Sequence, residues 1–416
     1  MDPLFADGLD GVDVLIILGK VVVTFLIVLL TVILTVWFER KVISDLQSRV
    51  GPNRAGPWGL LQTLADGMKL AFKEDMIPDA ADRRVFILAP YLSVVPAIAA
   101  FAIVPIGGNW ADGGDGTVEI FGRETFLQLA DPPIGALFFL AMSGIGVYGV
   151  MLAGWSSGSK YPLLGSIRAS AQIVSYEAAL GLALASVVLV SGTLSTNEMV
   201  TFQAGDGFGS FIPNWNLVAV GFIPAVLFVV AGTAELNRPP FDLTEAEQEL
   251  VGGYLTEYTS MRFAMYYLSE YMAMVTMSAL IVTFFLGGPA GPAPVGPVWL
   301  WSIGWFALKL VALLYFFVWA RASLPRLRYD QLMDFGWKVM IPAALGWFLI
   351  LATIRVSQDR YEGAGWAVAV GVAMAIALVG YGLLRLSLNA AHRARAKGEE
   401  WRPAQIHATP SDGAGS

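Results

Sequence analysis

Long apolar runs recur along the 416-residue sequence and constrain its fold more than any other feature. The first, Val14 to Phe38, contains Lys20 as its one charged residue and is long enough to span a bilayer with some tilt. Further runs lie at about 85–105, 133–153, 170–192, 217–236, 262–286, 299–320, 337–356 and 363–387. With a mean hydropathy of +0.63 and 14% charged residues, the sequence predicts an all-α polytopic membrane protein with nine transmembrane helices.

Lysine and arginine are distributed unevenly between the loops. If the N-terminus lies outside, the outer segments keep only Arg123, Arg355 and Arg360, and all other loop bases face the cytoplasm. The positive-inside rule therefore predicts an outer N-terminus and, with nine helices, a cytoplasmic C-terminus. Residues 1–13 hold four aspartates and no base, so we expect the first run to be a retained helix and not a cleaved signal peptide.

An acidic loop separates two of the apolar runs and contains a single base, Arg238. Carboxylates at this density repel one another, so some are expected to hold protons near neutral pH, as a proton relay requires. The alternative is that Thr244 and Glu247 form a helix capping box with Glu245 in the first turn, which would not explain six acids in one loop. The six are Glu235, Asp242, Glu245, Glu247, Glu249 and Glu257.

Further charges fall within the predicted spans themselves. Glu177, Glu270 and Lys309 lie inside apolar runs, and Glu39 lies at the inner end of the first. Charged groups in a membrane usually face a protein interior or a water-filled path. A buried structural ion pair is the alternative at each position. Together with the acidic loop, these residues suggest a polar track leading from the cytoplasmic side into the bilayer.

The loop after the first span is expected to be ordered. Gly and Pro residues at positions 51–57 predict a tight turn, and the following segment GLLQTLADGMKLAFKE separates polar and apolar side chains at helical spacing. We expect an amphipathic helix at the membrane surface. A lipid-interface anchor without further function is the alternative.

Cofactor chemistry is limited by composition. The chain has no cysteine, which excludes thiolate-held iron–sulfur clusters and zinc sites. His392 and His407, the two histidines, both lie in the polar tail, so no metal site and no haem is expected. We expect no cofactor bound covalently or through a metal, and any electron transfer would use other chains.

Four segments of this sequence resemble one family. ERKVISDLQSRVGPNRAGPWGLLQTLADGMKLAFKE, AGWSSGSKYPLLGSIRASAQIVSYE, ELNRPPFDLTEAEQELVGGYLTEY and FVWARASLPRLRYDQLMDFGWK are similar to the quinone-proximal membrane subunit of respiratory complex I, the proton-pumping NADH:quinone oxidoreductase. The likeness covers about residues 14–356. It implies eight transmembrane helices in a bacterial inner membrane and a quinone substrate, ubiquinone or menaquinone. It also implies, as partners, the hydrophilic-arm subunits of the quinone site and neighbouring small membrane subunits, in contact with lipid.

The resemblance also assigns roles, none of them as a redox centre. It implies a quinone chamber that includes Arg40, Arg49, Arg54, Gln62, Asp66 and Lys69. It implies a proton path along Glu39, Glu177, Glu235, Asp242, Glu245, Glu247, Glu249 and Glu257, which would couple quinone reduction to proton translocation. Structural or docking roles are implied for Lys160, Arg168, Arg238, Arg321, Arg326, Arg328 and Asp330.

The C-terminus departs from the family pattern. Residues 1–356 would form the family domain, 357–387 an additional transmembrane helix and 388–416 a polar cytoplasmic tail. Two other functions stay open, a homologous subunit of a membrane-bound hydrogenase-type complex and a stand-alone ion transporter. The sequence shows no evident internal repeat, which weakens the transporter hypothesis.

Overall fold

The chain folds into a bundle of long apolar helices in the computed structural model, which describes residues 2–5, 10–110, 114–205, 214–242, 251–294 and 296–360, with a few positions between 371 and 389. Among the described residues, seven helical segments are long and apolar enough to cross a membrane, and α8 (Phe222–Glu235) is apolar but shorter. The all-α polytopic class is confirmed. The seven are α1 (Gly11–Leu46), α3 (Arg83–Phe101), α4 (Gly135–Ser156), α5 (Lys160–Ser191), α10 (Ser260–Phe285), α11 (Val298–Ser323) and a final run of α12 (Tyr329–Phe335), the π-helical turn η5 (Gly336–Met340) and α13 (Ile341–Arg360).

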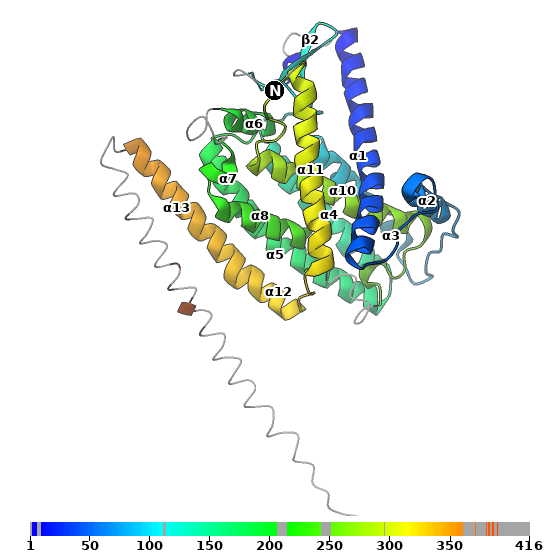
Figure 1. Cartoon of the computed structure of the whole chain (residues 1–416). Coiled ribbons are helices and arrows are strands. Elements are labelled where there is room, and N and C mark those ends of the chain that lie inside the picture. The colour runs from blue at the N-terminus through cyan, green and yellow to red at the C-terminus, as the bar shows by residue number, and fades with distance from the viewer. Residues whose placement is uncertain are drawn as a thin grey trace, which may run out of the picture.

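The helix at the centre of the bundle is α10. Every residue from Met274 to Phe285 is buried, and α10 packs against α1, α3 and α11. Helices α4, α5 and α8 continue the packing from α3, and α13 runs along α5 (Figure 1). The buried Tyr176 hydroxyl of α5 donates to the Leu332 carbonyl, 3.0 Å away, which fixes the start of the final helical run.

Several predicted spans differ from the observed helices in their bounds. The span expected over 217–236 was wrong as a single helix, because it is divided into α7 (Asn216–Ala219) and α8 at Gly221. Gly221 has a φ of 91°, and a Cβ there would lie 2.9 Å from the Trp347 ring, so the chain turns where a helix cannot continue. Helix α5 begins ten residues before the predicted 170. The predicted ninth span at 363–387 lies outside the continuously described residues.

One end of the bundle, here called the outer end, carries structure that the apolar runs do not predict. Strands β1 (Thr117–Ile120) and β2 (Arg123–Phe126) form an antiparallel hairpin, and α6 (Thr196–Ala204) lies nearby (Figure 1). Lys20 of α1 lies 2.6 Å from the Asp2 carboxylate and 3.0 Å from Thr125 of β2. These contacts join the N-terminal segment, the first span and the hairpin.

The opposite, inner end carries the loop after α1. Its tight turn, which includes the 3₁₀ turn η2 (Pro57–Gly59), is confirmed, because Gly59 has a φ of 78° and a Cβ there would lie 2.4 Å from the Pro52 carbonyl oxygen. The predicted surface helix is α2 (Gln62–Ala71), none of whose residues is buried. Thr63 donates to the Ile33 carbonyl, 3.3 Å away, so α2 rests beside α1.

Candidate functional site

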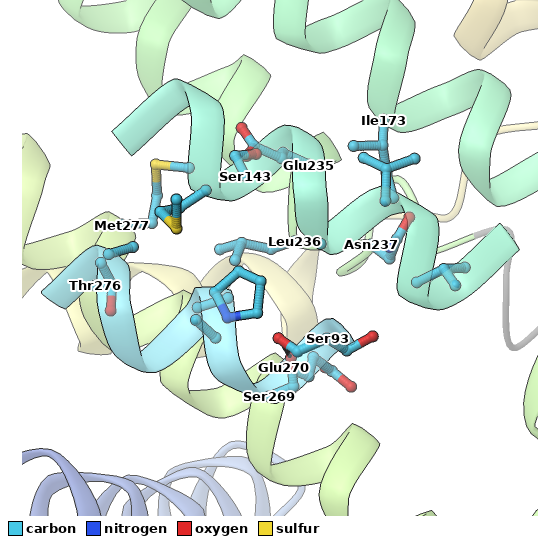
Figure 2. Close-up of a pocket in the computed structure, with 18 of the residues that line it drawn as sticks. Ser93, Ser143, Ile173, Glu235, Leu236, Asn237, Ser269, Glu270, Thr276 and Met277 are labelled. Atoms are coloured by element: carbon cyan, nitrogen blue, oxygen red, sulfur yellow. Dashed lines mark hydrogen bonds between the residues drawn. The ribbon is translucent and has the colours of Figure 1, made fainter. Parts of the chain in front are cut away.

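A cavity of about 140 Å³ lies between α3, α4, α8 and α10. Two carboxylates from the sequence analysis, Glu235 and Glu270, line it (Figure 2). Ser143 lies beside Glu235, while Ser93 and Ser269 lie near Glu270. The bundle therefore leaves a space, lined by both polar and apolar side chains, between two acids that belong to different helices.

The walls of this cavity hold buried oxygen atoms that make no hydrogen bond within the described residues. They are Ser93 Oγ, Glu235 Oε2, Asn237 Oδ1 and Thr276 Oγ1. Buried polar atoms are nearly always hydrogen-bonded to protein or to ordered water, and a cavity of this size has room for several water molecules beside these oxygens. The geometry therefore fits a hydrated compartment.

Glu235 is held where α8 ends. The chain leaves the helix through Asn237, whose φ is +52°, and through two prolines that cannot extend it. The Ser143 hydroxyl of α4 donates to Glu235 Oε1. On α5, Glu177 approaches α4 at Gly144, where a Cβ would lie 3.3 Å from its Oε1. Glu177 and Glu235 thus both approach α4, at the neighbouring positions Gly144 and Ser143.

A buried ion cluster adjoins the cavity. Arg238 Nη1 lies 2.8 Å from Glu39 Oε2, and its Nε lies 3.0 Å from Glu270 Oε1. Arg321 Nη1 bonds the second oxygen of Glu39. The Arg238 guanidinium also lies 4.5 Å from the centre of the Tyr271 ring. Glu270 thus belongs to both the ion cluster and the cavity wall.

The charge of Arg238 is fixed by this cluster. Burial by itself disfavours the charged form, but the carboxylates of Glu270 and Glu39 outweigh that effect and raise the pKa of Arg238 further above its ordinary value. With two guanidinium groups facing two carboxylates, the cluster is balanced. Glu39, predicted on the proton path, lies in this cluster and pairs with both Arg238 and Arg321.

The other predicted path residues lie in separate places. Asp242 is buried and pairs with Arg326 at 3.0 Å, and the Leu327 amide donates to the Pro240 carbonyl, so two inner loops are joined. Glu257 is half-buried between the 3₁₀ turn η4 (Gly253–Leu255) and α10. Three acids, Glu245, Glu247 and Glu249, and the proposed capping box lie outside the described residues.

The residues predicted for the quinone chamber meet only in part. Arg40 lies 2.5 Å from Asp66, and the Gln62 amide donates to the same carboxylate at 3.2 Å. This group connects the inner end of α1 to α2. The remaining three, Arg49, Arg54 and Lys69, are exposed on the same loop and helix.

Several site residues were not identified from the sequence. Ser143 and Asn237 are uncharged, and no local sequence pattern distinguishes them from their neighbours. Glu270 was recognised as an intramembrane charge but not placed on the path, and Arg238 and Arg321 were given only structural or docking roles. The available signal was that the acid Glu39 and the bases Arg238 and Arg321 all lie at or just beyond the inner ends of apolar runs. Within the described residues, no group of three or more His, Cys, Asp or Glu side chains is placed to hold a metal.

Comparisons with known proteins match this architecture. The family model for NADH dehydrogenase matches residues 19–352. The H subunit of NADH-quinone oxidoreductase from Frankia casuarinae is 50% identical over 372 residues, which cover 87% of this chain and 79% of that protein. The H subunits from Frankia alni and Streptomyces avermitilis are 50% and 45% identical over 368 and 367 residues, with 87% and 86% of this chain covered and 78% of each relative.

The fold and the comparisons define a polytopic membrane subunit of a multi-subunit redox enzyme. More particularly, the chain belongs to the family of NADH-quinone oxidoreductase H subunits. The relatives' names favour this family over a hydrogenase-type complex or a stand-alone transporter.

Proposed function

We propose that this chain carries part of the proton path that couples quinone reduction to proton translocation in NADH:quinone oxidoreductase. The path would run from the ion cluster at Glu39 and Arg238 through Glu270 and the cavity to Glu235 and Glu177. The observation that carries this proposal is the cavity, because it joins two carboxylates through a compartment lined by unpaired polar oxygens.

Charge coupling would supply the mechanism. Quinone reduction adds negative charge or removes protons near the inner end of the chain. Arg238 stays charged, so a change in the field at Glu39 acts on Glu270 through their shared guanidinium. Carboxylates that interact strongly titrate together, so a proton gained at Glu270 changes the occupancy of Glu235 and Glu177. Screening is weaker in this buried setting than in water.

The inner loop would supply one wall of the quinone chamber. Arg40 and Asp66 hold α2 against α1, and the exposed bases Arg49, Arg54 and Lys69 would face the chamber or the hydrophilic-arm subunits. Ubiquinone or menaquinone would be the substrate, and no redox cofactor would reside in this chain.

The proposed placement puts the inner end in the cytoplasm and the hairpin outside. The basic residues near the inner end support this orientation under the positive-inside rule. Other complex I subunits would cover the inner loops and neighbouring membrane helices, with lipid around the rest. Residues 1–356 would form the family domain, residues 357–387 an added span and residues 388–416 a cytoplasmic tail.

The path is tested with Glu177→Gln in the assembled, membrane-bound enzyme. This change keeps the size of the side chain but removes its titration. We expect lower coupled quinone reductase activity and proton pumping with normal assembly. Wild-type turnover and pumping would remove Glu177 from the path.

The subunit assignment has its own test. A C-terminally tagged chain in mildly solubilised membranes should migrate on a native gel with NADH dehydrogenase activity in one very large assembly. A tagged species that runs alone, while full activity appears elsewhere on the gel, would restore the stand-alone transporter hypothesis.

A further inference from the structure

Lys309 of α11 is an intramembrane cation that the ion cluster does not include. Its Nζ lies 2.8 Å from the Leu286 carbonyl oxygen, 2.8 Å from that of Gly288 and 3.0 Å from that of Ala290. All three belong to the turn after α10, at the outer end of the bundle. The ammonium also lies 5.2 Å from the centre of the Trp215 ring.

These contacts suit the charged form of the side chain. Three carbonyl acceptors need three N–H donors, which an ammonium has and a neutral amine lacks. The C-terminal end of α10 also carries the negative end of the helix dipole, and an aromatic face attracts a cation. The ammonium form of Lys309 therefore places a positive charge at the outer end of the central helix.

An apolar layer separates Lys309 from the cavity. The cavity reaches Met277 on α10, and the helix then continues to Phe285, a rise of about 12 Å. All of these residues are buried. The two hydroxyls among them, Ser278 and Thr283, donate to carbonyls of their own helix. Phe228 of α8 packs on this segment, with its ring centre 5.9 Å and 5.5 Å from those of Phe284 and Phe285.

Polar side chains at the outer end also donate hydrogen bonds to the last carbonyls of α10. The Gln203 amide donates to the Thr283 carbonyl at 2.8 Å, and the Asn216 amide donates to that of Phe284 at 2.8 Å. The end of α10 is thus closed by three side chains from α6, α7 and α11. Below this polar cap the wall is apolar.

We propose that the outer half of this bundle is a proton barrier, in which the apolar layer of α8 and α10 is closed by the positive charge of Lys309. This inference rests on the proposed function of the cavity as a proton path. Dry apolar constrictions and fixed cations both oppose proton passage. Protons in the cavity would then not leave through the outer end of this chain.

The barrier is tested with Lys309→Met in the whole enzyme reconstituted into liposomes, with Lys309→Arg as the matched control that keeps the charge. NADH oxidation builds a pH gradient, turnover is then stopped with an inhibitor, and the decay of the gradient is followed with a dye. We expect severalfold faster decay for Lys309→Met and wild-type decay for Lys309→Arg. Turnover with an ionophore present should stay near wild type. Wild-type decay in Lys309→Met, or equal leakage in both variants, would overturn the electrostatic barrier.

A second measurement does not depend on replacing Lys309. The chain has no cysteine, so Thr276→Cys places a single thiol of similar size on the cavity wall. A charged, membrane-impermeant thiol reagent added on the hairpin side of sealed vesicles should not label it. Labelling from that side would overturn the barrier. Failure of the proposed path is distinguishable, because it would appear as unchanged turnover and pumping in Glu177→Gln, whatever the decay in Lys309→Met.

Discussion

Arg238 Nη1 lies 2.8 Å from Glu39 Oε2, although the two residues are 199 positions apart in the sequence. The contact joins the inner part of the first span to the turn that follows α8. Both side chains are almost fully buried, so neither charge is solvated by bulk water. Each charge depends on the other for stabilisation, and the cavity wall depends on both through Glu270.

Removal of Arg238 should therefore damage the whole inner end. In Arg238→Met, Glu39 and Glu270 would lose the base between them, and breaking a buried pair in this way costs about 3–5 kcal/mol. We expect a lower melting temperature of the solubilised enzyme, measured as loss of the intact band on native gels. Lys338→Met, which breaks a half-exposed pair with Asp334 at 2.7 Å, should leave the band unchanged. Equal stability of the two variants would contradict the role given to Arg238.

Arg54 is expected to act on quinone reduction more than on electron entry. It is exposed on the inner loop, and Arg54→Ala removes a charge without a cavity in the core. We expect quinone reductase activity to fall while reduction of a water-soluble artificial acceptor is retained. Lys73→Ala, an exposed base further along the same loop, should affect neither. Equal loss of both activities in Arg54→Ala would indicate failed assembly instead.

The tight turn before α2 should tolerate no side chain at Gly59. In Gly59→Ala the new Cβ would meet the Pro52 carbonyl in a backbone conformation that favours glycine. We expect this loop to shift and quinone reductase activity to fall. Gly67→Ala lies in α2 with open space around it and should stabilise the helix by up to about 1 kcal/mol. Quinone reductase assays of membranes that carry either variant compare the two directly. Wild-type activity in Gly59→Ala would contradict a close-packed turn at this position.

The cavity volume can be reduced without a change of charge. Gly146 of α4 lines the cavity, and a Cβ there would meet no atom within 4 Å. Gly146→Val would occupy space and exclude water, so we expect proton pumping to fall, and Gly146→Ala should cause a smaller loss. Stopped-flow dye measurements of proton pumping rank the wild type and the two variants by pumping rate. Equal pumping in wild type, the alanine variant and the valine variant would show that this space is not needed.

The sequence predicted the helices well because apolar runs of membrane length are a local signal. It did not predict the division at Gly221, because a single glycine in an apolar run does not reveal its φ or the nearby Trp347 ring. The hairpin of β1 and β2 was also missed, since its strands are four residues long each and lie in a loop rich in glycine.

The site was predicted by residue type more than by arrangement. Glu235 and Glu177 both approach α4, at Ser143 and Gly144, and Arg40 pairs with Asp66. The pairing of Arg238 with Glu39 and Glu270 depends on how α1, α8 and α10 pack, which spacing along the chain does not encode. Lys309 was grouped with the polar track because it is a charged residue inside an apolar span. In the structure it binds backbone carbonyls at the outer end.

The central claim is that protons cross the cavity by way of Glu235, and NADH-driven proton pumping by the reconstituted enzyme with Glu235→Gln tests it most directly. Glu119→Gln, an exposed carboxylate on β1, is the matched control for the same chemical change. We predict that Glu235→Gln assembles normally and loses most of its pumping, while Glu119→Gln pumps like wild type. Full pumping by an assembled Glu235→Gln enzyme would contradict the proposed path.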